Sequence, residues 1–256
     1  MIPRGPVVIR SIAWVTVREI LRDKLLYNTL AFAVLLIGIA FLAARLSFIR
    51  PERILINFGT SGMSVALAVL ASLLGAQALL REFDRRTIWV ALAHPITRYQ
   101  FVWGKFAGVA LVLAANALLL TLILVASLST QVNEWHELWR PSLFVGIFFI
   151  FLQSLLIAAL ALFFASFTTF SLAVGLTLSL YLIGNSISQI RSAFEGGIVR
   201  NLTYLLPNLE NFSLGFKVTY DLPVGVLWAF GVSGYAVLWC FILILAAGLC
   251  LQGKES

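Results

Sequence analysis

Residues 58–80 read FGTSGMSVALAVLASLLGAQALL, and the adjoining residues 81–105 read REFDRRTIWVALAHPITRYQFVWGK. The first stretch has no charged residue and is longer than the roughly 20 residues that a helix needs to cross a bilayer. The second stretch contains seven of the chain's 29 charged residues, which are 18 basic and 11 acidic. A membrane-spanning helix that continues into a charged loop is the pattern from which we predict the fold.

The composition agrees with an integral membrane protein. Of the 256 residues, 61% are hydrophobic and only 11% are charged, whereas about 25% of the residues in soluble domains are charged. The mean hydropathy is +0.99, and the apolar runs are continuous, unlike the alternating strands of a β-barrel. Basic residues that flank membrane spans account for the net charge of +7, so the charge does not indicate nucleic-acid binding. We therefore predict an all-α integral membrane protein with no nucleic-acid partner.

Six apolar segments are close to the length of a membrane span or longer. They cover residues 27–48, 58–80, 101–128, 141–165, 169–190 and 226–251. We expect residues 1–256 to form a single transmembrane domain with both termini on the same side. If that side is the cytoplasm, it receives eleven of the 18 basic residues and the opposite side receives seven. This bias predicts cytoplasmic termini and a cytoplasmic loop at residues 81–105.

Residues 1–24 have the pattern of an amphipathic elbow helix that lies in the membrane interface. The predicted apolar side contains Ile9, Ala13, Trp14, Val17, Ile20 and Leu21. The predicted polar side contains Ser11, Arg18, Glu19, Arg22 and Asp23. Asp23 and Lys24 are expected to end this helix just before the first span. The alternative is an unstructured basic tail.

Residues 191–225 lie on the predicted outer side and mix apolar clusters with polar residues. We predict short interfacial or re-entrant helices in this region, with a break at Pro207.

Motifs for catalysis, nucleotide binding or metal binding are absent from the sequence. It contains no GxxxxGK[ST], GxSxG or HExxH pattern and no Cys/His cluster, so we predict a chain that is not an enzyme and binds no metal or cofactor itself. No acidic residue falls near the middle of a predicted span, which disfavours a proton- or ion-coupled carrier. The polar residues inside the spans are Gln77, Asn116, Gln153 and Asn185. They would either contact cargo or join helices by hydrogen bonds.

The charged loop has the features of a short helix between two spans. Asp84 or Thr87 is predicted to lie near the start of this helix, and Pro95 is predicted to end it. Thr97 is expected to cap the helix that follows. The short helix would present an apolar ridge made of Ile88, Trp89 and Leu92. Such a ridge suits insertion into a groove of a partner protein, although the loop could equally be a well-anchored connection whose charges set the topology.

The order of residues in this loop resembles a known family. Glu82 and Thr87 precede the short helix, the sequence Pro-Ile-Thr-Arg follows at 95–98, and Gly-Lys follows at 104–105. This order is similar to the segment after the second span of ABC transporter permeases of the type-2 exporter family. The elbow helix, the six spans and the outer broken helices agree with that family. Arg86 departs from the pattern, because many members have glycine before the threonine.

The resemblance implies that two permease chains, identical or related, pair in the membrane and that each binds a separate ATPase subunit. ATP and Mg would be bound by that ATPase. Residues 84–93 would form the coupling helix, and Pro95 and Arg98 would direct the chain into the third span. The residues expected at the ATPase interface are Glu82, Asp84, Arg85, Arg86, Thr87, Ile88, Trp89, Leu92, Pro95 and Arg98.

We therefore expect the permease subunit of an ATP-driven exporter in a bacterial plasma (inner) membrane, in contact with membrane lipids and extracytoplasmic accessory proteins. Its cargo is expected to be hydrophobic or lipid-linked, because the spans contain few charges. One alternative is a non-transporting subunit that transmits ATPase motion to an extracytoplasmic partner through residues 191–225. Another is a self-contained carrier or channel. The sequence leaves open the cargo and whether the permease pair is a homodimer or a heterodimer.

Overall fold

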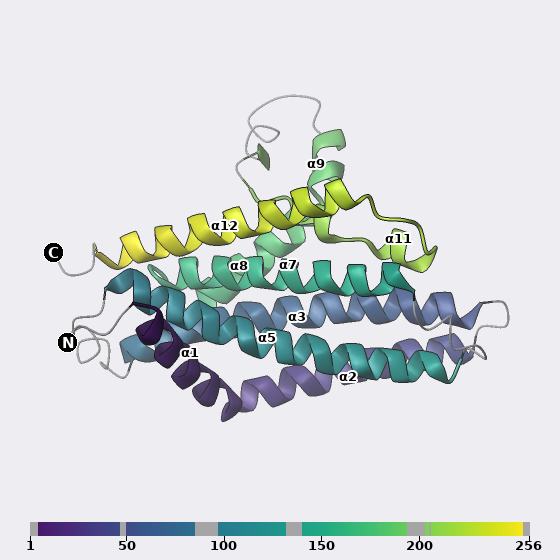
Figure 1. Cartoon of the computed structure of the whole chain (residues 1–256), viewed down its shortest axis with the longest axis horizontal. Coiled ribbons are helices and arrows are strands. Elements are labelled where there is room, and N and C mark those ends of the chain that lie inside the picture. The colour runs from purple at the N-terminus through teal and green to yellow at the C-terminus, as the bar shows by residue number, and fades with distance from the viewer. Residues whose placement is uncertain are drawn as a thin grey trace.

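The computed structural model describes residues 5–46, 50–84, 97–131, 140–193, 203–204 and 206–252. In these ranges all regular secondary structure is helical, and Figure 1 shows an elongated bundle of helices that run along one axis. Five helices are long and apolar enough to cross a membrane, and a bent pair of helices forms a sixth span if it is counted as one. The all-α integral membrane fold is therefore confirmed.

The helices follow one another in antiparallel order. They are α1 (Gly5–Leu21), α2 (Lys24–Arg45), α3 (Pro51–Asp84), α5 (Arg98–Ser129), α7 (Pro141–Ala165), α8 (Phe170–Gly184), α9 (Ile187–Ala193), η1 (Glu210–Phe212), α11 (Gly215–Thr219) and α12 (Val226–Gln252). The two termini lie at the same end of the bundle, and α11 lies at the opposite end (Figure 1).

α3 and α7 form the centre of the bundle and are the most buried of the candidate spans, whereas α2 is the least buried. Small residues let the two central backbones approach closely. A Cβ atom on Gly75 would lie only 2.7 Å from the carbonyl oxygen of Ala158 and 2.8 Å from the Cβ of Ala161. The close contact between α3 and α7 therefore depends on a residue without a side chain at position 75.

The span predicted at residues 169–190 corresponds to a bent pair of helices. α8 ends at Gly184, and α9 begins at Ile187 after a bend of 65°. The 15 residues of α8 extend about 22 Å, which is less than the roughly 30 Å hydrocarbon core of a bilayer. The returning chain closes this end of α8, because the amide of Leu209 donates a hydrogen bond to the Gly184 carbonyl at 3.0 Å. Asn185 and Ser186 at the bend are polar, but polar residues also occur inside the continuous helices, so they do not by themselves reveal where α8 ends.

The short broken helices predicted for residues 191–225 are present in the described part of that region. The chain is not helical at residues 206–209, around Pro207, and then forms η1 and α11. A carboxylate oxygen of Glu210 accepts a hydrogen bond from the amide of Ser188 at 3.1 Å, which fixes η1 to the start of α9. The predicted break at Pro207 is therefore confirmed.

Candidate functional site

The candidate site is the end of the bundle that holds both termini, which we call the junction. It comprises α1, the last turns of α3, the first turns of α5 and the last turn of α12 (Figure 1). The segment that joins α3 to α5, residues 85–96, lies outside the described residues. The predicted interface residues in that segment are Arg85, Arg86, Thr87, Ile88, Trp89, Leu92 and Pro95, so their placement stays a prediction.

Two further predicted interface residues, Glu82 and Asp84, belong to the last turn of α3, and the structure gives no account of their side chains. Asp84 is the final residue of α3. The membrane helix thus continues through the sequence Arg-Glu-Phe-Asp at 81–84, and the start of the short helix near Asp84 or Thr87 stays a prediction because the residues that follow lie outside the described ranges. The backbone of α3 thus carries the chain directly to the predicted docking segment.

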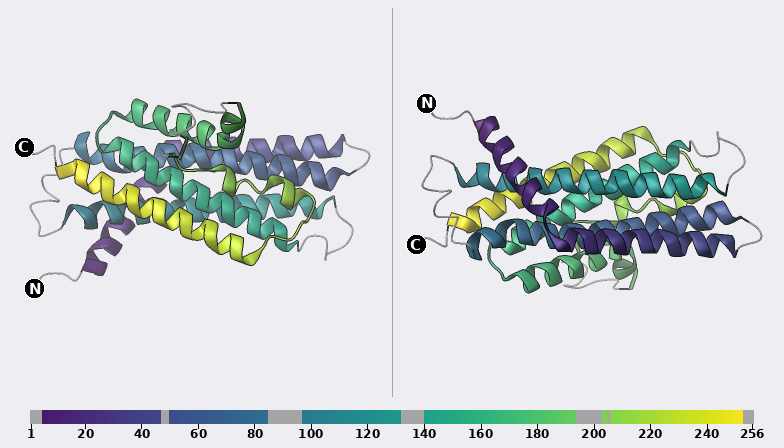
Figure 2. Two further views of the ribbon diagram at one scale, coloured as in Figure 1. Left: turned by 90° about the horizontal axis from the view of Figure 1, so that it is seen from above. Right: turned by 90° about the horizontal axis from the view of Figure 1, so that it is seen from below.

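α1 lies in a groove on α5 that two glycines create. Gly104 and Gly108 are four residues apart and therefore share one face of α5. A Cβ on Gly104 would lie 2.7 Å from the Cβ of Ile12, and a Cβ on Gly108 would lie 2.6 Å from the Cβ of Thr16. Side chains of α1 thus occupy the space that larger residues on α5 would need, as in other helix pairs with glycine at this spacing. Figure 2 shows that α1 crosses the bundle obliquely before the chain turns into α2.

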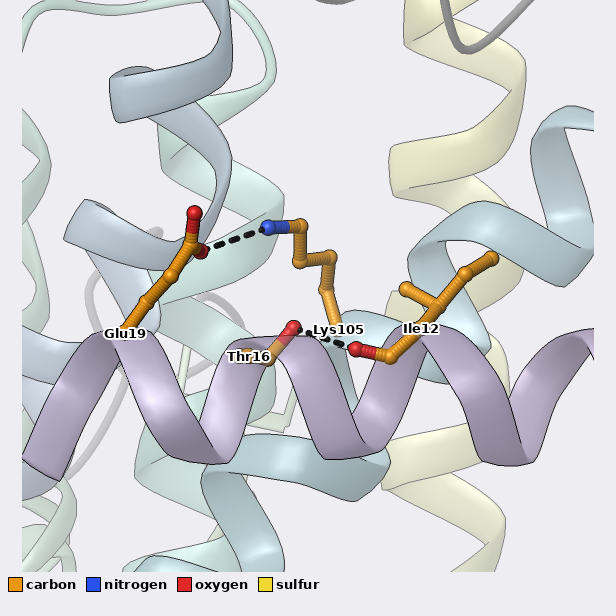
Figure 3. Close-up of polar contacts among 4 residues, drawn as sticks. All are labelled: Ile12, Thr16, Glu19 and Lys105. Carbon is orange, nitrogen blue, oxygen red and sulfur yellow. Dashed lines mark hydrogen bonds and ion pairs between the residues drawn. The ribbon is translucent and has the colours of Figure 1, made fainter.

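An ion pair also holds α1 against the same part of α5. The Nζ atom of Lys105 lies 3.3 Å from a carboxylate oxygen of Glu19, and Figure 3 shows the two side chains reaching toward each other from α5 and α1. Lys105 is only 2% exposed. A buried ammonium group is costly unless an opposite charge or hydrogen-bond acceptors compensate it, so the Glu19 carboxylate contributes directly to this packing.

A second ion pair joins the corner between α1 and α2 to α3. Asp23, which is buried, accepts a hydrogen bond from the guanidinium of Arg81 in the last part of α3. The two ion pairs together connect the elbow region to the helices on both sides of residues 85–96. A displacement of either flanking helix would therefore have to move α1 or break a charge pair.

The predicted faces of the elbow helix need correction. The helix itself is confirmed, but Glu19 and Asp23 face the bundle rather than the polar surroundings. Trp14 and Leu21, on the predicted apolar side, are 55% and 49% exposed. The reason is that the partners of the two carboxylates, Lys105 and Arg81, lie far along the chain, so the pattern within residues 1–24 cannot indicate which face is packed. The exposed tryptophan and leucine instead suit contact with the membrane interface.

The start of α5 has the cap that was predicted. The hydroxyl of Thr97 accepts a hydrogen bond from the amide of Gln100 at 3.4 Å, and the Gln100 side chain accepts one from the amide of Thr97 at 3.1 Å. This reciprocal arrangement is a capping box. Arg98, the one predicted interface residue whose side chain is described, donates a hydrogen bond to the Leu251 carbonyl at 3.3 Å. Arg98 therefore fixes the start of α5 to the end of α12.

Two of the four polar residues inside the spans are brought together. The Gln153 side chain, on α7, donates a hydrogen bond to the Asn185 side chain at 3.0 Å and accepts one from the hydroxyl of Ser64, on α3, at 3.1 Å. Gln153 is 2% exposed, and these bonds join three helices at the place where α8 ends. A cavity of about 40 Å³ beside Gln153 has room for roughly two or three water molecules, so it does not have the size of a lipid-like cargo.

The other two polar residues lie apart from this cluster. The amide of Asn116 donates a hydrogen bond to the Val112 carbonyl of its own helix at 2.9 Å. The Oε1 atom of Gln77 is buried without a hydrogen-bond partner among the described residues. The structure thus supports a helix-joining role for Gln153 and Asn185, but it shows no such role for Asn116 or Gln77.

Sequence reasoning missed the residues that hold α1 in place. The glycine spacing at 104 and 108 is a readable signal for close helix packing. The pairing of Glu19 with Lys105 has no local signal, because 86 residues separate them. Within the described ranges, no group of three or more His, Cys, Asp or Glu side chains is arranged to hold a metal ion.

Comparison with known families identifies the chain. A family model described as ABC-2 family transporter protein matches residues 10–199, which begin within α1 and continue past α9. No curated protein matches the chain. The match covers well over half of the sequence and includes both ion pairs of the junction. The chain therefore belongs to the ABC-2 family of transporter proteins and is a membrane permease subunit of the kind that works with an ABC ATPase.

Proposed function

We propose that this chain is the permease of an ATP-driven exporter and that the separate ATPase docks at the junction. The observation that carries the proposal is the pair of ionic links, Glu19–Lys105 and Arg81–Asp23. They connect α1 to both helices that flank residues 85–96, the segment that we expect to contact the ATPase. The junction is thus built to transmit a displacement of that segment to several spans at once.

The mechanism begins at the ATPase, which binds ATP and Mg and changes shape. Residues 84–93 would follow that motion, and the contact residues would be those that the sequence predicts around Arg86, Ile88 and Trp89. Because α1 fits into the glycine groove of α5 and pairs with Lys105, α1 and α5 would move as one unit. The hydrogen bond from Arg98 to Leu251 would extend this unit to α12.

The path for cargo is proposed to form between two permease chains. The cavity beside Gln153 is too small for a lipid-like molecule, with a volume of about 40 Å³. α2 is the least buried span, and the apolar side chains of Tyr27, Leu35 and Leu42 are exposed along it. A second chain packed near this surface would create a path lined by apolar side chains. Such a path favours a hydrophobic or lipid-linked cargo, because charged molecules would lose hydration without compensating partners.

The orientation follows from the distribution of basic residues. We propose that the junction faces the cytoplasm of a bacterial cell and that α9, η1 and α11 face the outside. An ATPase that uses cytoplasmic ATP would then reach residues 85–96 without crossing the membrane.

A second candidate function is the transmission of ATPase motion to an extracytoplasmic partner without transport. The observation that favours it is the firm attachment of the outer helices to the spans. A Cβ on Gly146, in α7, would lie 2.4 Å from the Val218 side chain of α11, and Glu210 fixes η1 to α9. Motion of the spans would therefore reach the outer surface with little loss, and accessory proteins bound there would respond to it.

The test is purification of the chain with its ATPase, followed by reconstitution in vesicles that contain a fluorescent phospholipid as the probe cargo. We expect co-purification, ATP-dependent movement of the probe between leaflets, and ATP hydrolysis that the probe stimulates. Movement of the probe without ATP would contradict the exporter. ATP hydrolysis that an outer partner stimulates, with no movement of probe lipid, would favour the second candidate.

A further inference from the structure

The end of the bundle opposite to the junction holds two basic side chains over aromatic rings that α11 and its neighbours provide. The guanidinium of Arg53 lies 4.9 Å from the centre of the Tyr220 ring, and the ammonium of Lys217 lies 4.7 Å from the centre of the Trp228 ring. Within the described part of the chain, neither cation forms an ion pair. Both charges are therefore held by ring faces rather than neutralised by carboxylates.

These four residues lie at the level where the spans begin. Arg53 is in the first turn of α3, and Trp228 is in the first turn of α12. Lys217 and Tyr220 come from α11 and the residue that follows it. Tryptophan, tyrosine and basic residues are typical of the headgroup level of a membrane. We therefore expect the site at the depth of lipid phosphates, in the leaflet that faces away from the termini.

The two rings are fixed before any ligand binds. The Trp228 ring packs against Phe149, a fully buried residue, with a centroid distance of 5.5 Å. The Tyr220 ring packs against Phe216 with a centroid distance of 4.6 Å. α11 is itself anchored, because Val218 is buried against the notch at Gly146. Lys217 therefore lies over a ring that is packed against the core, which lowers the entropy that a ligand would have to overcome there.

Both basic side chains are only partly buried, so solvent or a ligand can reach them. A guanidinium that lies over a ring uses its face, whereas its N–H donors point outward in its plane and match the oxygens of a phosphate. Lys217 and Tyr220 are three residues apart, so Lys217 and the ring that holds Arg53 belong to the same turn at the end of α11. The carboxylate of Asp221 does not compete for them, because it accepts a hydrogen bond from the Ser142 hydroxyl on α7.

We propose that Arg53 and Lys217, supported by Tyr220 and Trp228, bind the phosphate of an anionic lipid headgroup in the leaflet that faces away from the termini. The exposed apolar side chains of Phe216 and Leu227 beside the site, which are 69% and 89% exposed, would contact the acyl chains of that lipid. The inference rests on the membrane location of the chain and not on its direction of transport.

The test is native mass spectrometry of the full chain in a non-ionic detergent, titrated with phosphatidylglycerol and, separately, with phosphatidylcholine. We expect preferential binding of phosphatidylglycerol. The double variant Arg53→Gln with Lys217→Gln should bind it about tenfold more weakly, because each basic residue near a membrane surface contributes measurably to the attraction of anionic lipid. The double variant Arg53→Lys with Lys217→Arg should retain most of the binding.

The matched control is Arg50→Gln with Arg140→Gln, which removes two positive charges from the same end of the bundle. We expect it to bind phosphatidylglycerol as the unaltered chain does. Equal losses in the two double variants would overturn the proposal, because the attraction would then be a general effect of charge. The proposal also fails if phosphatidylcholine binds as tightly as phosphatidylglycerol, or if excess inorganic phosphate displaces the lipid and so identifies a free anion as the ligand.

Discussion

The two ends of the bundle hold their charges in different ways. At the junction, buried Lys105 and Asp23 form ion pairs with residues of other helices. At the opposite end, Arg53 and Lys217 lie over aromatic rings. Ion pairs between helices resist separation of those helices, whereas cations on ring faces keep their donors available for an external anion. The comparison indicates one end built to transmit motion and another built to contact the membrane surface.

The largest expected effect is at the predicted docking segment. The double variant Trp89→Ala with Arg86→Glu should reduce ATP-driven transport in reconstituted vesicles at least about tenfold, since central aromatic and arginine contacts often contribute 2 kcal/mol or more at interfaces. The thermal midpoint of the isolated chain should not change.

A matched control for that variant lies at the other end of the bundle. Phe58 is 61% exposed and Arg50 is exposed, so Phe58→Ala with Arg50→Glu makes the same chemical changes away from the junction. We expect this control to keep its transport activity. If the docking variant binds its ATPase and transports as the unaltered chain does, residues 86 and 89 do not have the role that we assign to them.

The next effect concerns the groove for α1. Gly108→Leu should destabilise the chain by about 3 kcal/mol, because the added side chain must displace Thr16 and the backbone of α1. We expect the thermal midpoint in detergent to fall by about 5 °C or more. Gly175→Leu is the control, since a Cβ at that position would meet nothing within 4 Å. Similar midpoints for the two variants would show that α1 does not need the groove.

A smaller effect is expected from the ion pair itself. Glu19→Gln should destabilise the chain by roughly 1–2 kcal/mol, because Lys105 would lose its carboxylate while its side chain stays buried. Water makes this destabilisation smaller than for a fully buried pair, because the Glu19 side chain is 32% exposed. Adding Lys105→Met should restore much of the stability, and a double-mutant cycle measures the coupling. Additive effects of the two substitutions would contradict the link between α1 and α5.

The smallest expected effect is a difference in stability between substitutions at two polar residues inside the spans. Gln153→Leu should lower the free energy of unfolding by about 1 kcal/mol, because it removes hydrogen bonds to Ser64 and Asn185. Asn116→Leu should change the free energy of unfolding by less than about 0.5 kcal/mol. Among the described residues, the Asn116 side chain donates its hydrogen bond to Val112 of the same helix. Thermal midpoints in detergent compare the two variants. A larger loss of stability for Asn116→Leu than for Gln153→Leu would contradict the helix-joining role that we assign to Gln153.

The sequence predicted the features that local patterns determine. Long apolar runs identified the spans, Thr97 indicated the start of α5, and Pro207 indicated the break in the outer region. The GxxxG spacing at Gly104 and Gly108 was also readable, although its partner helix was not.

Features set by contacts between distant residues could not be predicted in the same way. The amide of Leu209 bonds to the end of α8 at Gly184, and Leu209 comes from a part of the chain well beyond the bend. The packed face of α1 depends on Lys105 and Arg81, which belong to other helices. Long-range charge pairing of this kind has no periodic signal within one segment.

The central claim is that α1 and α5 move as one unit when the ATPase acts. Spin labels at Trp14→Cys on α1 and Leu118→Cys on α5 would test it most directly, because both positions are exposed and the native cysteines, Cys240 and Cys250, can be replaced. Pulsed electron paramagnetic resonance on the complex with its ATPase should give one narrow distance distribution that is the same with and without ATP. Glu19→Gln should broaden that distribution. A shift of the α1–α5 distance on ATP binding, with both ion-pair residues intact, would contradict the account.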